Sequence, residues 1–334
     1  MTKNNPPVSV IIVDYKQINP YRDEAIKALK EQTYPNFEVI IVTDYKLKSP
    51  PKFPRLKLKS YGHYVGPAKK RDDGAKIAKG EILVFLDDDA YPYVLWLARL
   101  IRHFKRSSIA AVGGPGINPP NISWLEAASG WFSSSPLGLG PYSYRFIAQP
   151  IRFVDDFPSM NLAIRKSDFN AVGGFDSHFY PGEDTKICLD LVYKLKKKIL
   201  YDPEVLVFHH RRPLLFPHLK QNGNYGLHRG YFARTLPKTS FRFPYLLPSL
   251  ILISFIYLFL ALPFPLIRFP YFFTLVLGSV SLYLSVLLLN SLWVTYHSKN
   301  PFQGIISIPV TLLTHFWYGL RFLQGFLFTT QLKR

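Results

Sequence analysis

The stretch Ile82-Leu-Val-Phe-Leu-Asp-Asp-Asp89 joins five apolar residues to three consecutive carboxylates. A continuous apolar run of this length is typical of a strand that is covered on both faces, as in a parallel sheet. One Asp at the end of the strand could cap a following helix. Three acids in a row repel one another, and a hard divalent cation that takes oxygen ligands would account for their crowding.

The chain around this stretch alternates between strand and helix patterns. Helices are predicted from Asn19-Pro20, over Pro67–Lys79 and over Tyr91–Lys105. Further strands are predicted at Val8–Val13, Phe37–Val42, Leu56–Ser60, Ile109–Val112, Asn161–Ile164 and Val205–Phe208. Such βαβ alternation predicts an α/β fold with a doubly wound, mostly parallel sheet.

Acids follow three of the predicted strands, at Asp14, Asp44 and Asp87–Asp89. In doubly wound sheets ligands bind beyond the carboxyl ends of the strands, so these acids are expected at a ligand site. Successive side chains of a strand point to opposite sides, which places Asp87 and Asp89 together and Asp88 opposite them. That geometry favours a structural or helix-capping role for Asp88.

Three other motifs carry chemistry, each with a plainer alternative. Arg71 in the predicted basic helix could face a phosphate held by the metal, or lie on a solvated face. Glu183-Asp184 opens a helix, so the pair could be an N-cap or include a general base. His209 and His210 end a strand and point to opposite faces, so at most one is expected to bind the metal.

The C-terminal part of the chain has a different composition. Residues 1–204 carry 29 of the 41 Lys and Arg and all 22 acids, so no acid follows Glu204. The apolar stretches Pro244–Leu266, Tyr271–Val294 and Gly304–Phe328 predict two to three transmembrane helices. A basic chain can bind nucleic acid or an anionic membrane, and these stretches favour membrane lipids and no nucleic acid.

Three regions are predicted on this basis. Residues 1–212 form a cytosolic catalytic domain, 213–242 a basic amphipathic segment for the lipid headgroup layer, and 243–334 a multi-pass part in the cell membrane. Basic residues before the first span favour the cytosolic side. The short apolar run at the N-terminus does not fit a signal peptide, and the single Cys188 fits a reducing compartment. Residues 115–150 are expected to be a long irregular segment with one short helix.

The combined motifs resemble the family 2 glycosyltransferases with the GT-A fold, over about residues 6–235. The matching motifs are Asp14, Asp44, Ala68-x-x-Arg71-x-x-Gly74, Ala78-x-Gly80-Glu81, Phe85-Leu-Asp-x-Asp89, Asn161, Gly173-Gly-Phe-Asp176, Gly182-Glu-Asp184 and His209. The segment His315–Gly325 is also similar to the closing membrane segment of members that build exopolysaccharides and other glycans.

The resemblance implies a role for each candidate residue. Asp44 would contact the nucleobase with Asp14 near it, Arg71 would lie by the base or the diphosphate, and Asp87 would hold the ribose. Asp89 would coordinate Mn²⁺ or Mg²⁺, assisted by His209 or His210, and Asp184 would be the catalytic base. Asp88 is grouped with the nucleotide-sugar-binding residues. Residues implied on the acceptor or donor-sugar side are Asn161, Asp176, Glu183 and Arg211.

The implied reaction is a metal-dependent, inverting transfer from a UDP- or GDP-sugar to a hydroxyl of a lipid-linked or membrane-associated glycan. The first alternative is transfer to a polyprenyl phosphate, and the second is a non-catalytic nucleotide-binding membrane scaffold. The first two strands end in Val13-Asp-Tyr-Lys16 and Thr43-Asp-Tyr-Lys46, where the family usually has Pro-Thr-Tyr-Asn and Asp-Asp-Gly-Ser. These differences surround the base pocket, so the motifs do not identify the nucleobase.

Overall fold

The computed structural model describes residues 5–179 and 182–332, which form two compact units. The first unit comprises the chain up to Pro119 together with Arg145–His210. The second comprises Pro120–Tyr144 and the chain from Arg211 onward. The segment Pro120–Tyr144 lies within the predicted catalytic region along the sequence, yet its contacts are with the C-terminal helices.

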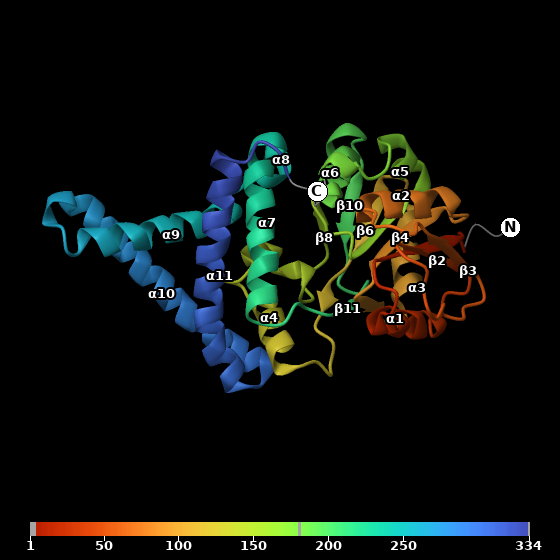
Figure 1. Ribbon diagram of the computed structural model, residues 1–334, viewed down its shortest axis with the longest axis horizontal. Coiled ribbons are helices and arrows are strands. Elements are labelled where there is room, and N and C mark those ends of the chain that lie inside the picture. Colours follow the sequence, from red (N-terminus) through yellow and green to blue (C-terminus); the bar gives the residue numbers. More distant parts are fainter. Residues whose placement is uncertain (1–4, 180–181, 333–334) are drawn as a thin grey trace. The chain divides into compact units, whose positions relative to one another are not determined.

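An eight-stranded sheet forms the centre of the first unit (Figure 1). Its order is β3-β2-β1-β4-β9-β6-β10-β8. The strands are β1 Val8–Asp14, β2 Phe37–Thr43, β3 Leu56–Ser60, β4 Ile82–Asp87, β6 Ile109–Gly113, β8 Arg152–Val154, β9 Asn161–Arg165 and β10 Lys198–Tyr201. β3, β2, β1 and β4 are parallel, whereas β9 runs antiparallel to both β4 and β6.

Helices cover both faces of this sheet, as the continuous apolar strands require. On one face, Val10 and Ile12 of β1 join a buried cluster with residues of α1 (Pro20–Lys30) and α3 (Trp96–Ile101). On the other face, Gly74 of α2 (Pro67–Ile77) lies against the side chain of Ile11. α5 (Lys166–Val172) and α6 (Glu183–Leu189) complete the helices of this unit, with short turns η1 Arg102–Lys105, η3 Ser177–Phe179 and the π-helical η4 Asp190–Lys194.

A second sheet of three short strands, β5 (Ala90–Pro92), β11 (Val207–His209) and β7 (Gly116–Ile117), was not predicted. It corrects the prediction of a helix from Tyr91, because Tyr91 pairs with Phe208 of β11 and the helix begins at Trp96. The two rings stack with centroids 4.9 Å apart. A long-range strand pairing has replaced the local helical pattern, and it brings the end of β11 beside the acids that follow β4.

The second unit is helical. Its helices are α4 Trp124–Ser134, α7 Phe216–Thr235, α8 Pro237–Ser240, α9 Phe243–Ala261, α10 Pro270–Ser298 and α11 Pro301–Leu327, with turns η2 Gly140–Arg145 and η5 Pro265–Ile267. α7 and α11 run side by side (Figure 1). Among the described residues, α9 and α10 are long and apolar enough to cross a membrane, and only 22% of the most apolar stretch of each is buried.

Candidate active site

The carboxyl ends of β1 and β2 carry two fully buried acids joined by one lysine. Lys70 of α2 extends its ammonium group to Oδ1 of Asp44 at 2.9 Å and to the backbone oxygen of Asp14 at 2.9 Å. Lys70 is itself only 3 % exposed. The sequence motifs include its neighbour Arg71, and the only sequence signal for Lys70 is its place in the same basic helix. Lys70 therefore fixes the two strand ends relative to each other.

The carboxylate of Asp14 is fully engaged by the protein. It pairs with Nη1 of Arg22 at 2.8 Å and accepts hydrogen bonds from the backbone N–H of Lys16 and from Nδ2 of Asn19. Asn19 is the N-cap of α1 and also donates to Oδ2 of Asp88 at 2.6 Å. Asp14 thus anchors the start of α1, and Asn19 connects it to the acidic triplet.

The carboxylate of Asp44 differs from that of Asp14 in one respect. Its Oδ1 accepts from Lys70 and from the backbone N–H of Val65 at 2.8 Å. Its Oδ2 is buried and has no hydrogen-bond partner within residues 5–179 and 182–332. An unsatisfied buried acceptor is costly and is often kept for a ligand.

Asp87, whose side chain is 30% exposed, is held by a chain of ion pairs with two buried side chains. Arg71 of α2 donates from Nη2 to Asp87 at 2.9 Å and from Nη1 to Glu183 of α6 at 2.8 Å. The guanidinium also lies 5.5 Å from the ring centroid of Phe175. Arg71 therefore couples the end of β4 to the start of α6, which carries the predicted base.

Asp87, Asp89 and His209 form a group that can hold a metal ion, since one ligand atom of each lies within 4.8 Å of the others. Nε2 of His209 is 3.0 Å from Oδ1 of Asp89, and these side chains are 14 % and 13 % exposed. The adjacent His210 turns away: its ring stacks on Tyr21 and its Nε2 lies 2.9 Å from Glu24. The structure thus brings His209, and not His210, to the two acids.

Asp88 faces away from this group, toward Asn19. Burial raises the pKa of the Asp88 carboxyl well above its usual range, and the nearby charges of Asp89 and Asp14 add to the shift. A protonated Asp88 relieves the repulsion that three adjacent carboxylates would otherwise produce. Its contact with Asn19 agrees with the predicted structural role. The predicted capping role is wrong for the helix that follows, because β5 comes directly after Asp89 and the N-cap of α3 is Leu95.

The two acids at the start of α6 lie in different environments. Glu183 is buried, and burial raises the pKa of its carboxyl against the opposing effect of Arg71. Asp184 is half-buried, and its Oδ1 accepts a hydrogen bond from the N–H of Thr185 at 2.8 Å. Because Glu183 is committed to Arg71, it acts on the site by positioning Arg71 and Asp87.

The remaining candidates lie in three different settings. Asn161 is fully buried; it accepts from Trp96 Nε1 and donates to the backbone oxygens of Gly114 and Val205, so its amide is engaged in the core. Asp176 contacts His178 through both the backbone and the ring of that residue. Arg211 belongs to the helical unit, where its N–H donates to Glu126. Hydrogen bonding at Asn161 favours a structural role there over a sugar contact.

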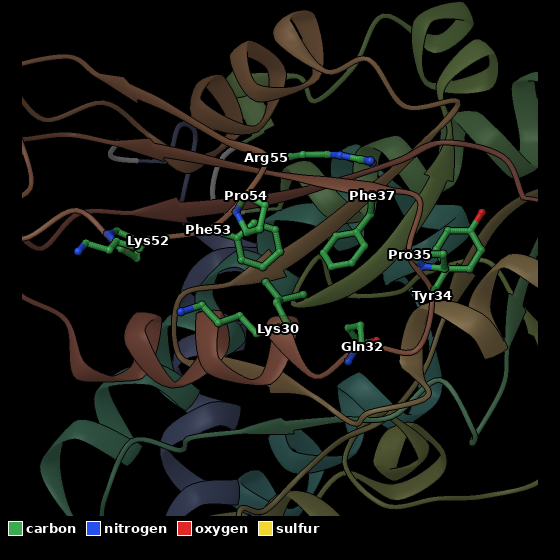
Figure 2. A pocket seen from close by; sticks show the side chains of 11 residues that line it. Lys30, Gln32, Tyr34, Pro35, Phe37, Lys52, Phe53, Pro54 and Arg55 are labelled. Carbon is green, nitrogen blue, oxygen red and sulfur yellow. The ribbon is translucent and has the colours of Figure 1, made fainter.

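One pocket of about 850 Å³ lies away from this edge (Figure 2). It is lined by the end of α1, the start of β2 and the loop before β3. Its residues are Leu29, Lys30, Gln32, Tyr34, Pro35, Phe37, Pro51, Lys52, Phe53, Pro54 and Arg55. The start of β2 is the amino end of that strand, opposite the acids at the carboxyl ends, so this pocket is separate from the candidate site.

Comparison with known sequences shows which protein family has these motifs. A family model for glycosyl transferase family 2 matches residues 9–169. The pre-mycofactocin glycosyltransferase of Mycobacterium tuberculosis is 31% identical over 170 residues, which is 49% of this chain and 34% of that protein. The glucosyl-dolichyl phosphate glucuronosyltransferase of Haloferax volcanii is 20% identical over 221 residues, 60% of this chain and 68% of that protein. The chain thus covers about a third of the length of the first relative.

A solved structure shares the fold. The mannosyltransferase PcManGT from Pyrobaculum calidifontis, determined in complex with GDP-Man and Mn²⁺, superposes with a TM-score of 0.55 and 18% identity. The match covers 95% of this chain and 87% of that one. The α/β unit therefore has the GT-A fold that the motifs predicted, although its sheet contains more antiparallel pairing than expected. With the named relatives, the family model identifies residues 9–169 as a family 2 glycosyltransferase domain.

Proposed function

We propose that the chain is a metal-dependent, inverting glycosyltransferase that moves a sugar from a UDP- or GDP-sugar to a hydroxyl of a lipid-linked or membrane-associated glycan. The observation that carries this proposal is the group of Asp87, Asp89 and His209 at the carboxyl end of β4. It lies on the same sheet edge as the buried, partly unsatisfied carboxylate of Asp44. The cation group would suit the diphosphate of a nucleoside diphosphate, and the polar acceptor on the same edge would suit its base.

The donor set fits a divalent cation. Two carboxylates and one imidazole suit Mn²⁺, and the two carboxylates alone suit Mg²⁺, which prefers oxygen ligands. Asp87, Asp89 and His209 would hold the ion. When bound, it would neutralise negative charge on the departing nucleoside diphosphate.

The protein's own residues divide the remaining work. Asp184 would accept the proton of the acceptor hydroxyl as that oxygen attacks the sugar. Arg71 holds Asp87 in place and is itself held by Glu183. A base that lies outside the metal group stays available for the proton, as this reaction requires.

The apolar helices of the second unit support an acceptor substrate that is associated with a membrane. Two of its helices are long and apolar enough to cross a membrane, and one relative is named for acting on a glucosyl-dolichyl phosphate. We place the α/β unit on the cytosolic side, because Arg229, Arg234, Lys238 and Arg242 precede the first candidate span.

The test is release of nucleoside diphosphate by the purified full chain, offered a panel of nucleotide sugars with Mn²⁺ or Mg²⁺ and a membrane extract as acceptor source. Release that depends on the metal and rises with the extract supports the proposal. Lack of release from every donor would count against an enzyme and favour the nucleotide-binding scaffold.

A further inference from the structure

We infer that Asp156 is a positioning residue for the reaction. Through the hydroxyl of Thr185 it fixes the first turn of α6, and in this way it holds the carboxylate of Asp184 where that group can take a proton. This inference rests on the proposed function, because it assumes that Asp184 is the base. Asp156 lies in the loop between β8 and β9, and none of the sequence motifs includes it.

The start of α6 needs support from outside the helix. α6 has seven residues, and a helix of this length gains too little from its own hydrogen bonds to be stable alone. Its N-cap is Gly182, which has no side chain to accept a hydrogen bond from the N–H groups of the first turn. Asp184 is the second residue of α6, so its position depends on contacts that other parts of the chain make with this turn.

Thr185 connects Asp156 to the proposed base. Its hydroxyl donates to Oδ1 of Asp156 at 3.0 Å, and Asp156 and Thr185 are each only 3% exposed. The backbone N–H of Thr185 donates to Oδ1 of Asp184 at 2.8 Å. A shift of Thr185 relative to Asp156 would therefore also shift the donor that orients Asp184.

A second contact joins the same loop to the same face of α6. The thiol of Cys188 donates to the backbone oxygen of Phe157, the residue after Asp156, at 3.5 Å. Thr185 and Cys188 are three positions apart, which places them on one side of a helix. The loop thus holds α6 along one face, and the contact of Thr185 is the one beside the base.

Arg145 holds Asp156 in turn. Its Nη2 donates to the backbone oxygen of Asp156 at 2.8 Å and to Oδ2 of the carboxylate at 3.2 Å. The two side chains are 12% and 4% exposed, so this is a largely buried ion pair. Oδ2 therefore faces Arg145 and Oδ1 faces Thr185. A hydrogen bond from a hydroxyl to a carboxylate is stronger than one between neutral groups, which suits Asp156 to hold α6 firmly.

A positioning role and a purely structural role have different kinetic consequences. Misplacement of a reacting group by about 1 Å can cost about a hundredfold in rate, so a small rotation of the first turn is enough to slow the transfer. None of the residues that would hold the cation belongs to α6. Loss of the Thr185 contact should therefore lower the rate of the chemical step and leave donor binding in place.

The test compares Thr185→Val with Thr185→Ser in the full chain in lipid nanodiscs. Valine has the shape of threonine without the hydroxyl, whereas serine keeps it. The substrate is the nucleotide sugar from which the unaltered chain releases nucleoside diphosphate, with a fixed amount of membrane extract. We expect Thr185→Val to lower kcat at least about tenfold, while the KM for the donor and the calorimetric Kd for its nucleoside diphosphate stay close to those of the unaltered chain.

Thr185→Ser should keep most of kcat, because its hydroxyl can still donate to Asp156. An unchanged kcat in Thr185→Val, or equal losses in the two variants, would overturn the inference and leave the proposed function standing. Lack of release by the unaltered chain from every donor would overturn both.

A double variant shows whether Thr185 acts through Asp184. Residues that act as a unit have non-additive effects, so Thr185→Val should have little further effect on kcat when Asp184→Asn is already present. A further loss as large as in the unaltered chain would mean that Thr185 does not act through Asp184, and it would overturn the inference.

Tyr193→Phe is the matched control. It also removes a hydroxyl that donates to a carboxylate of the same loop, Oδ2 of Asp155 at 2.6 Å. This variant should keep the kcat of the unaltered chain even where its apparent Tm falls as far as that of Thr185→Val. An equal loss of kcat in Tyr193→Phe would show that any weakening of this loop slows the enzyme, against a specific role for Asp156.

Asp156→Asn keeps the inference testable should Thr185→Val fail to fold. It preserves the volume of the side chain and removes the charge that faces Arg145, so the hold on Thr185 becomes weaker. We expect a lower kcat with unchanged nucleotide affinity. An undiminished kcat in this variant would overturn the inference.

Discussion

Among single residues, two adjacent histidines differ most clearly in their contacts. His209 lies 3.0 Å from Asp89, whereas His210 contacts Glu24 and Tyr21. His209→Ala should therefore weaken Mn²⁺ binding at least tenfold, since loss of even an outer-shell partner of a metal ligand typically costs about 10- to 100-fold. The change is measured by metal titration of nucleotide binding in the full chain.

His210→Ala is the control for this experiment, because it removes the same kind of side chain one residue away. It should change Mn²⁺ affinity by less than about threefold, well below the effect of losing a ligand. Equal losses for the two variants would remove His209 from the metal group.

Asp184 and Glu183 give a second matched pair. Asp184→Asn should lower the turnover number about 10²- to 10⁴-fold while nucleotide affinity stays near its original value, since only the proton acceptor is lost. Steady-state kinetics and nucleotide titration separate these effects.

Glu183→Gln should instead lower the stability of the fold. It removes the charge that faces Arg71 in a buried site, at a cost of about 1–3 kcal/mol in the free energy of unfolding. A denaturant titration of both variants would show the loss for Glu183→Gln alone. A large kinetic defect without loss of stability in Glu183→Gln would mean that Glu183 contacts the reacting groups.

The sequence indicated these residues as candidates for the site, but it did not indicate most of the residues that they contact. Strand periodicity was enough to place Asp88 opposite Asp87 and Asp89, because that relation is local. The pairing of Lys70 with Asp44 joins residues 26 positions apart in different elements, so no local pattern carries it. The same applies to His209, whose approach to Asp89 depends on the pairing of β11 with β5.

At the scale of elements, α7 and α11 approach closely through glycines. A Cβ atom on Gly230 would lie 2.1 Å from the backbone oxygen of Phe322, and backbone cannot move aside cheaply. Gly230→Ala should thus destabilise the helical unit by about 1–3 kcal/mol, as overpacking does in other interiors. The apparent Tm of the full chain in detergent measures this.

Gly278 in α10 is the corresponding control, because a Cβ there would meet nothing within 4 Å. Gly278→Ala should leave the Tm unchanged or raise it slightly, since Ala favours a helix. A similar drop for both variants would argue against close packing of α7 on α11 as the cause.

Most elements of the first unit could be predicted because their signal is local. β1, β2, β3 and β4 start at the residues where the predicted strands start. Strand direction is not local: nothing in Asn161–Ile164 shows that β9 runs antiparallel between β4 and β6. The assignment of Pro120–Tyr144 to the helical unit depends likewise on distant contacts, such as that of the Leu137 N–H with Asn290.

For the whole molecule, the apolar helices of the second unit predict that the chain inserts into a membrane. α9 and α10 expose large apolar side chains such as Phe259, Leu275 and Leu282, whose contact with water would be unfavourable. The full chain should therefore remain in the membrane pellet after extraction at alkaline pH. Release into the supernatant would instead support a soluble chain with an unusual apolar surface.

We propose that Asp87, Asp89 and His209 hold the cation on which sugar transfer depends. The most direct measurement is a Mn²⁺ titration of nucleoside diphosphate release, by the chelator-treated full chain and by its Asp89→Asn variant. We predict that chelation abolishes release, that Mn²⁺ restores it in the unaltered chain, and that Asp89→Asn recovers less than about a hundredth of it even at high Mn²⁺. Release that persists without metal, or that Mn²⁺ restores equally in both proteins, would contradict the claim.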